Sequence, residues 1–584
     1  MSSTSSKPNL PNKMENPFAI SYSEISPALL ETPTFHPQLS KLSNRHVFLK
    51  SATPLEERHE AEMEGLLPAG VHSLETEIER ALGQMRSYDT ALQKYVFLTE
   101  LAATSSTVFY GLLMGNLTEV MPLVYTPTVG AGCQEYSHIT RSRPQGLFIT
   151  PSHQGRIRKI LDNWMFPVHI IVVTDGSRIL GLGDLGAGGM GIPVGKLSLY
   201  VAAGGFHPAY TLPVTLDFGT DNEDLLNDPL YVGVRRPRLS GEEYYALMEE
   251  FMVAVNDKWP GVLVQFEDFS NDKCFDILDM YRHRYPSFND DIQGTGAVVA
   301  AGFVVAARVL GVPISEHRCV FLGAGSAGIG VADRIVSLMV QEGLTEEEAR
   351  ARFWFLDSKG LVVKGVREPL ASHKVPYART DVTESESSLL EVIRTVKPTA
   401  LVGLSKSAGA FTDEIIRAVH ENCPQPLIFP LSNPTSKSEC TAEEAFRATN
   451  GACLFASGSP FPNVTLDDGR EFEAMQANNC HIFPGLGMGA VLTRASEVTE
   501  NMVNAAVIGL ADCVTDEDIA AGRLYPSIAN IRATSARVGA SVAVQAVKDG
   551  VSDLDFGGKG VDELVAEVTA AMYVPGGDKT LSRL

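Results

Sequence analysis

The spacing of hydrophobic and polar positions changes along the chain, and each spacing predicts a different kind of element. Residues 54–116 carry apolar side chains at helical intervals, with the clearest run at Leu92, Tyr95, Val96, Leu98 and Leu101. Residues 121–210 instead contain short β-rich runs, such as 169–173 and 177–180, separated by glycine-rich turns. The pattern therefore predicts a helical N-terminal region followed by a mixed α/β lobe.

Strands and helices alternate from residue 318 onwards. This region follows a helical pattern at 242–257 and an apolar run at 261–266 that reads as a buried strand. The order then runs strand 319–322, helix to 341, strand 353–356, helix near 387–395, strand 400–404, helix after 412 and strand 426–431. Strands separated by helices imply a parallel sheet wound on both faces. We therefore predict an α/β protein that ends in a doubly wound domain.

The N-terminal segment and the cysteines indicate a cytoplasmic location. Residues 1–50 are rich in Ser, Pro and Asn and lack a clear period, which predicts an arm that could be ordered against a partner subunit. Its first 44 residues contain no Arg, which argues against a mitochondrial presequence. The apolar run 294–307 is shorter than the roughly 20 residues that cross a bilayer. The eight scattered cysteines form no CxxC pair and fit a reducing compartment.

The charge balance excludes two classes of partner. The chain has 48 Lys plus Arg and 70 Asp plus Glu, which gives a formal net charge of −22. Such an acid surplus argues against binding to nucleic acid, which needs clustered positive charge, and against docking on anionic membranes.

Three glycine-rich runs compete as a dinucleotide fingerprint: 181–186, 323–328 and 485–490. Only 323–328 lies between a β-rich run and a helical pattern, so its backbone can approach a pyrophosphate at a helix N-terminus. We assign the cofactor contact to this run, which comprises Gly323, Ala324, Gly325, Ser326, Ala327 and Gly328; the alternative is a tight turn without a ligand. The run 181–186 is followed by glycines and Pro193 rather than by a helix, which favours a close-packed loop.

The end of the second strand of this domain bears on the choice between NADP and NAD. Asp357 stands where an acid commonly accepts hydrogen bonds from the ribose hydroxyls. Ser358 and Lys374 could meet a 2′-phosphate, although a solvated basic turn would look the same. This favours NADP and leaves NAD possible.

Two acidic pairs abut strongly apolar segments. Glu267 and Asp268 end the strand-like run, and Asp290 and Asp291 precede an apolar helix. Carboxylates at element ends suit Mg²⁺ or Mn²⁺, which prefer oxygen ligands. The alternative, four solvated acids in turns, is weakened because unpaired charge next to apolar surface is costly.

Eight stretches along residues 55–545 match, in order, the motifs of one family. They are VYTPTVG at 124–130, RILGLGDLG at 178–186, GIPVGK at 191–196, QFEDF at 265–269, FNDDIQGT at 288–295, LSNPT at 431–435, FASGSPF at 455–461 and NNCHIFPG at 478–485. On these residues the chain resembles malic enzyme, which converts malate to pyruvate and CO₂ by oxidative decarboxylation. The resemblance implies an arm at 1–50, an N-terminal catalytic domain at 51–290, a Rossmann-type NAD(P)-binding domain at 291–545 and a tail at 546–584, in a homodimer or homotetramer.

The resemblance also implies roles for single residues. Tyr125 would be the general acid and Lys196 the general base, with Asp290 in the catalytic network near Lys196. The metal ligands would be Glu267, Asp268 and Asp291. Arg178 would bind a carboxylate of malate, whereas Asn433 and Asn478, with Asn479 beside them, would touch substrate or nicotinamide.

Two rival functions remain. A 2-hydroxy-acid dehydrogenase that stops at the keto acid would need no metal carboxylates, and a cofactor-binding regulatory protein would need no catalytic pair. The acid surplus adds one expectation, because malate and NADP are themselves anions. The binding cleft must be locally positive, and the candidates are Arg178, Lys196, the divalent metal and Lys374.

Overall fold

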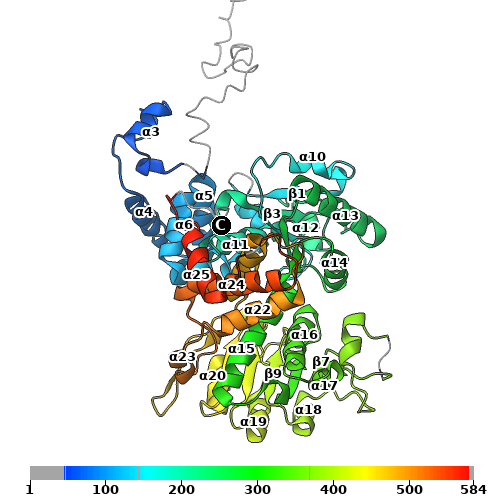
Figure 1. The fold of residues 1–584 in the computed structure, drawn as a ribbon. Coiled ribbons are helices and arrows are strands. Elements are labelled where there is room, and N and C mark those ends of the chain that lie inside the picture. Colours follow the sequence, from blue (N-terminus) through cyan, green and yellow to red (C-terminus); the bar gives the residue numbers. More distant parts are fainter. Residues whose placement is uncertain (1–44, 47, 142–144, 367–368, 555, 578–584) are drawn as a thin grey trace, which may run out of the picture.

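The structure is a computed structural model that describes residues 45–46, 48–141, 145–366, 369–554 and 556–577 (Figure 1). Most of the arm predicted at 1–50 therefore lies outside the described residues. The chain begins with short helices and continues through two predominantly parallel sheets. All eight cysteines are free, as expected for a chain without a disulfide framework.

Helices form the N-terminal region, as the apolar spacing predicts. They are α3 (Leu55–Glu60), α4 (Leu74–Arg86), α5 (Ala91–Thr104), α6 (Ser106–Gly115), α7 (Leu117–Val124), α8 (Thr128–Gln134) and α9 (Tyr136–Ile139). Ser73 caps α4, because its hydroxyl accepts a hydrogen bond from the backbone N–H of Thr76. Leu98 and Leu101 of α5 are buried in the main core, which explains the predicted periodicity.

The first sheet contains five parallel strands in the order β1-β3-β2-β4-β5. Their bounds are β1 Leu147–Ile149, β2 Ile170–Thr174, β3 Thr211–Leu216, β4 Leu263–Phe266 and β5 Ser287–Asn289. The helices of this region are α10 (Ile157–Leu161), α11 (Gly191–Ala202), α12 (Glu223–Asn227), α13 (Gly241–Lys258) and α14 (Cys274–Tyr281). Ile170 packs in one core with Leu197 of α11, whereas Ile171 packs in a second core with Phe251 of α13. Both faces of the sheet are therefore covered.

Two local predictions in this region are wrong. Residues 177–180 form a turn with an isolated bridge between Ile179 and Gly183 rather than a strand. Pro193 does not prevent a helix, because it lies in the first turn of α11, where a backbone N–H has no partner within the helix. The glycines before α11 form the short helix η4 (Gly186–Met190).

The second sheet contains seven strands in the order β14-β11-β10-β9-β6-β7-β8. The bounds are β6 Cys319–Leu322, β7 Phe353–Asp357, β8 Gly360–Leu361, β9 Ala400–Gly403, β10 Leu427–Pro430, β11 Leu454–Ser457 and β14 Met475–Gln476; β12 (Val464–Thr465) and β13 (Glu471–Phe472) form a separate hairpin. Only the β7–β8 pair is antiparallel among the described pairs of this sheet. The side chain of Phe321 packs in the same core as Ile170, and the side chain of Val320 packs in a third core. Helices therefore cover both faces of this sheet, as predicted.

The helices around this sheet also follow the predicted order. They are α15 (Thr295–Leu310), α16 (Ser326–Gln341), α17 (Glu346–Arg350), α18 (Leu389–Val396), α19 (Asp413–Asn422) and α20 (Ala442–Ala448). The segment Asp290–Leu310, which comprises η6 (Asp290–Gly294) and α15, is long and apolar enough to span a membrane, but 78% of its most apolar 18-residue window is buried inside the protein. It packs against α16 and α22 as a core helix.

The C-terminal helices return to the N-terminal half. They are α21 (Phe483–Leu492), α22 (Glu500–Ala511), α23 (Asp516–Ala520), α24 (Ile531–Lys548) and α25 (Val561–Ala571). Figure 1 shows α24 and α25 beside the N-terminal helices and α11. Arg532 of α24 donates to the carbonyl of Ala202, and the N–H of Tyr573 donates to the carbonyl of Gly205. The last described residues thus complete the lobe that the first ones begin.

Candidate active site

A cavity of about 130 Å³ lies where strands from both sheets end. The carboxyl ends of β4, β9 and β10 lead into it, which is where open parallel sheets bind their ligands. The predicted site residues that line it are Tyr125, Arg178, Lys196, Glu267, Asp268, Asp291, Ala327, Asn433, Asn478 and Asn479. Residues separated by more than 350 positions in the sequence therefore share one cavity, as the hypothesis of a common site requires.

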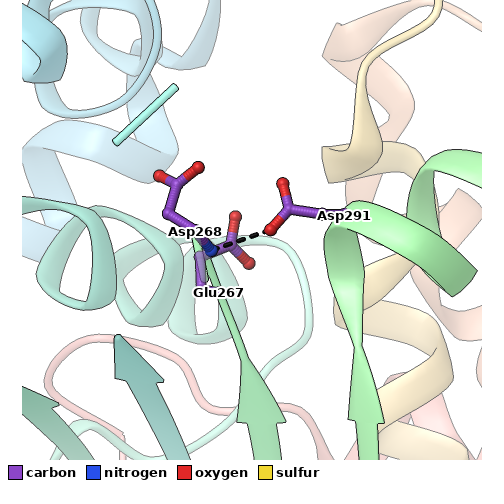
Figure 2. Close-up of side chains that lie close together, drawn as sticks. All are labelled: Glu267, Asp268 and Asp291. Carbon is purple, nitrogen blue, oxygen red and sulfur yellow. Dashed lines mark hydrogen bonds between the residues drawn. The ribbon is translucent and has the colours of Figure 1, made fainter. Parts of the chain in front are cut away.

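Glu267, Asp268 and Asp291 form a cluster of carboxylates at one wall of this cavity. One oxygen from each lies within 4.8 Å of the others, and Figure 2 shows the side chains at the ends of the neighbouring strands β4 and β5. The N–H of Asp268 donates to Oδ2 of Asp291 at 2.7 Å. Asp268 has a positive φ of 55°, a strained backbone that is typical of functional sites.

The electrostatics of this cluster fit a divalent cation. Burial, together with Asp291, raises the pKa of Asp268 to about 8, and burial likewise raises the pKa values of Glu267 and Asp291. Oδ2 of Asp268 is buried and has no hydrogen-bond partner among the described residues. Three buried carboxylates placed side by side repel one another, and a hard cation with oxygen ligands would offset that cost. The predicted ligand set is thus the one that the structure brings together.

Lys196 lies on α11 with its side chain only 2% exposed. Its Nζ is 2.5 Å from Oδ2 of Asp290 and 3.1 Å from Oε1 of Glu267. Burial lowers the pKa of the Lys196 ammonium, but these two carboxylates outweigh burial and hold the pKa well above its usual range. Asp290 does not line the cavity; it is fully buried behind Lys196 and also accepts from Asn479 at 2.8 Å. The two carboxylates therefore favour the protonated form of the lysine.

Tyr125 follows α7 and faces the same lysine. Its ring centroid lies 5.4 Å from Nζ of Lys196, and the side chain is only 5% exposed. Burial raises the pKa of the Tyr125 phenol, so the hydroxyl keeps its proton at neutral pH. A protonated hydroxyl beside the cavity can act as a proton donor.

The predicted substrate-binding residues reach the cavity from three loops. Arg178 donates from Nη1 to Ser326 at 2.7 Å and to Asn271 at 3.2 Å, so it joins the first lobe to the glycine-rich loop. Asn433 accepts from Ser459 at 2.5 Å, and Asn478 accepts from the N–H of Cys480 at 3.0 Å. These contacts fix the amides at the rim of the cavity.

The glycine-rich run 323–328 connects β6 to α16, as the fingerprint prediction requires. Gly323 has a positive φ of 116°, and an added Cβ would lie 2.5 Å from the carbonyl oxygen of Leu404. An added Cβ on Gly328 would lie 2.4 Å from the carbonyl oxygen of Gly323. Both positions thus need glycine for a close turn into the helix, and Ala327 in the first turn of α16 lines the cavity, so the positive end of the helix dipole lies beside it.

Asp357 ends β7, beside the turn that contains Ser358. Nζ of Lys374 donates to Oδ2 of Asp357 at 2.9 Å, and the side chain of Ser358 is exposed. Lys374 comes from η8 (Ser372–Tyr377), and the adjacent His373 stacks on Phe275. The structure therefore brings together the acid and the lysine that were assigned to the ribose end of the cofactor.

The cavity also contains Lys406 and Thr295, which the sequence reasoning missed. Thr295 accepts from Asn479 at 3.0 Å, and Lys406 follows β9. No motif marks Lys406, but its place just beyond a predicted parallel strand is a signal that could have identified it, because such strands end at the ligand edge of the sheet.

Comparisons with known proteins identify the family of this chain. Two family models match: the malic enzyme N-terminal domain over residues 102–282 and the malic enzyme NAD-binding domain over residues 292–547. An NADP-dependent malic enzyme from Dictyostelium discoideum is 49% identical, over 90% of this chain and 96% of its own. An NAD-dependent malic enzyme from Shewanella denitrificans is 44% identical, over 90% of this chain and 92% of its own.

A solved structure shares the fold. The crystal structure of malic enzyme from Entamoeba histolytica has a TM-score of 0.53 at 24% identity, covering 79% of this chain and 91% of that one. The two family models together span most of the chain, and the similarity to the Dictyostelium discoideum enzyme extends over 90% of it. The chain belongs to the malic enzyme family, an oxidoreductase family that decarboxylates malate with NAD or NADP.

Proposed function

We propose that this malic enzyme uses NADP and a divalent cation, with Lys196 as the base and Tyr125 as the acid. The observation that carries the proposal is the shared cavity, in which Lys196, Tyr125 and the carboxylate cluster face the loop at the start of α16. Glu267, Asp268 and Asp291 would hold Mg²⁺ or Mn²⁺. When bound, the nucleotide supplies the hydride acceptor and the cation supplies positive charge for the negative charge that develops as CO₂ leaves.

The chain's own residues move the protons. Nζ of Lys196 and Oδ2 of Asp290 are 2.5 Å apart, so a proton can pass from the lysine to the carboxylate. The neutral amine then accepts the proton of the C2 hydroxyl of malate. The Tyr125 hydroxyl, which stays protonated because it is buried, delivers a proton to C3 of enolpyruvate.

Substrate and nicotinamide are positioned by the residues at the rim. Arg178 suits a carboxylate of malate, because its planar fork can pair with both oxygens. Asn433, Asn478 and Asn479 offer amide donors and acceptors around the same cavity. These residues orient malate with its C2 hydroxyl toward Lys196.

The preference for NADP is supported by the ion pair at the end of β7. Lys374 lies 2.9 Å from Asp357, so its ammonium is already placed at the acid that would face the ribose. A 2′-phosphate would compete for this ammonium and for the exposed hydroxyl of Ser358. NAD lacks that phosphate and would gain nothing from Lys374.

We also propose that the chain works as a homodimer or homotetramer. Helix α3 projects from the body in Figure 1, and this region exposes Leu55 to 61% and Leu66 to 59%. Apolar side chains on a projecting segment suit an interface with a second copy. Light scattering of the Leu55→Ser, Leu66→Ser double variant should give a smaller mass than wild type, and an unchanged mass would contradict this interface.

Initial rates test the function directly. Malate and Mg²⁺ are supplied with NADP or NAD, and CO₂ is measured beside the reduced nucleotide. We expect one CO₂ per NADPH and a higher kcat/KM with NADP. Reduced nucleotide without CO₂ would instead indicate a plain 2-hydroxy-acid dehydrogenase, and no turnover with either nucleotide would indicate a binding protein.

A further inference from the structure

Ion pairs within the chain already engage part of the positive charge at the cleft. The chain carries a net charge of −22, and malate and NADP are anions. Two lysines expected to attract them are already paired: Lys196 with Asp290 and Glu267, and Lys374 with Asp357. Of the cations lining the cavity, this leaves Arg178 and Lys406 to meet an incoming anion.

Lys406 forms no ion pair with a described carboxylate within 4.0 Å, which distinguishes it from Lys196. Its Nζ donates to the backbone carbonyl of Leu180 at 3.1 Å, and this is the only hydrogen bond that the ammonium makes within the part of the chain that the structure describes. An ammonium has three N–H groups, so two remain for a ligand. Burial is the main cause that lowers the pKa of Lys406, and the nearby positive charge of Arg178 is the second.

The backbone holds Lys406 firmly in place. Its φ is 61°, a left-handed conformation that a residue with a side chain rarely adopts. The N–H of Lys406 donates to Oγ of Ser432 at 2.8 Å, and that hydroxyl donates to Glu439 at 2.6 Å. The surrounding structure thus imposes a strained position, which places the side chain in the cavity.

The position of Lys406 links the nucleotide loop to the substrate cavity. The preceding residues, Leu404 and Ser405, lie directly against Gly323 of the fingerprint. Its contact, Leu180, donates its own N–H to Asp268 of the carboxylate cluster at 3.0 Å. Lys406 therefore stands between the diphosphate-binding loop and the place where malate would lie.

We propose that Lys406 is a further anion-binding residue of this enzyme, whose ammonium takes an oxygen of either the cofactor diphosphate or a malate carboxylate. The proposal rests on the proposed function, since it places the two ligands in this cavity. Both sources offer the same chemistry, an anionic oxygen that accepts from an ammonium. The side chain thereby also joins the two lobes across the ligand, through Leu180.

Three variants separate the effect of the Lys406 charge from the effect of its left-handed backbone. Lys406→Gln removes the charge, Lys406→Arg keeps it, and Lys406→Gly removes it while accepting the left-handed φ. Lys437→Gln is the matched control, because Lys437 is exposed on a neighbouring loop and carries the same charge. For each variant, calorimetry gives the Kd of NADP in the absence of malate and metal, and steady-state kinetics with Mg²⁺ give KM for malate and kcat.

We expect Lys406→Gln and Lys406→Gly to raise one of these constants about 10-fold, with Lys406→Arg and Lys437→Gln close to wild type. A raised Kd for NADP would show that Lys406 binds the cofactor diphosphate. A raised KM for malate alone would show that it binds a malate carboxylate. A loss of kcat with both constants unchanged would show a structural role and overturn the proposal, as would no change at all. Failure of the proposed function would appear separately, as an inactive wild type, while calorimetry would still report on nucleotide binding.

Discussion

Lys196 and Asp290 form a buried ion pair, with 2.5 Å between Nζ and Oδ2. Both side chains are at most 2% exposed, so little water weakens the interaction. Asp290 favours the charged form of Lys196, the proposed base, and it is also close enough to accept the proton of that lysine. Its contribution to catalysis can be measured by changing the carboxylate and leaving the lysine.

Asp290→Asn should lower kcat by about 100-fold while changing KM for malate little, because the lysine loses its proton acceptor but the binding residues remain. Steady-state kinetics with saturating NADP and Mg²⁺ measure both constants. Asp276→Asn removes the same charge from an exposed position on α14 and serves as the control. Equal kcat values for the two variants would argue against the proton route.

Mg²⁺ should raise the Tm of the nucleotide-free protein, because a cation that binds the folded carboxylates stabilises them against unfolding. At about 100 times its Kd the ion contributes roughly 2.7 kcal/mol. Asp291→Asn should abolish most of the shift, whereas Asp467→Asn, a 93% exposed acid, should keep it. Chelation by EDTA should stop turnover of the wild type. A shift that survives in Asp291→Asn would place the ion elsewhere.

Lys374→Gln should raise KM for NADP about 10-fold and leave KM for NAD nearly unchanged. The variant removes a charged partner of the 2′-phosphate, and only NADP carries that phosphate. Initial rates with each nucleotide at saturating malate give the two values. Lys364→Gln, an exposed lysine of the same domain, is the control. Equal increases in KM for both nucleotides would show that Lys374 does not determine the preference for NADP.

The acid stability of the protein should depend on His481. Its ring is 2% exposed, stacks on Tyr525 and faces two backbone carbonyls, and burial lowers its pKa to about 4. Between pH 6.5 and 4 the unfolded chain binds a proton that the folded ring does not, so stability falls as the pH falls. The full loss is about 3 kcal/mol.

Urea unfolding at pH 7 and pH 5 measures this effect. The wild type should lose more stability across that interval than His481→Gln, which has no group that titrates there. His283→Gln changes a histidine whose side chain is 72% exposed and should behave like the wild type. If His481→Gln and wild type lost the same stability, another buried group would cause the acid sensitivity.

The regular elements were predictable where local pattern and tertiary packing agree. The strand at 319–322 matches β6 residue for residue, because both faces of that strand are buried and its sequence is continuously apolar. The run at 177–180 was predicted as a strand from its residue types, but the fold uses it as a turn. Leu180 has a φ of 48°, and an added Cβ on Gly181 would lie 2.3 Å from the carbonyl oxygen of Asn433, a contact with another lobe that no local pattern reports.

The motifs predict which residues form the candidate site, but they do not predict which of its charged side chains pair with one another. The carboxylate cluster and Lys196 were named from sequence, and they do share a cavity. The pairing of Lys374 with Asp357 and the place of Lys406 were not predicted as such, since an ion pair depends on where two distant segments meet. Charge counts along a chain therefore overestimate the positive charge that a folded cleft offers.

The return of the last helices to the first lobe constrains how the protein can fold during synthesis. Arg532 bonds to Ala202, 330 positions earlier, and Met572 and Tyr573 are buried against the turn at Gly205. A ribosome delivers the N-terminal half long before these partners leave the exit tunnel. The apolar surface of α11 and its neighbours then stays uncovered until the segment from Arg532 to Tyr573 has left the tunnel. Chaperone demand should accordingly persist until after the dinucleotide domain has emerged.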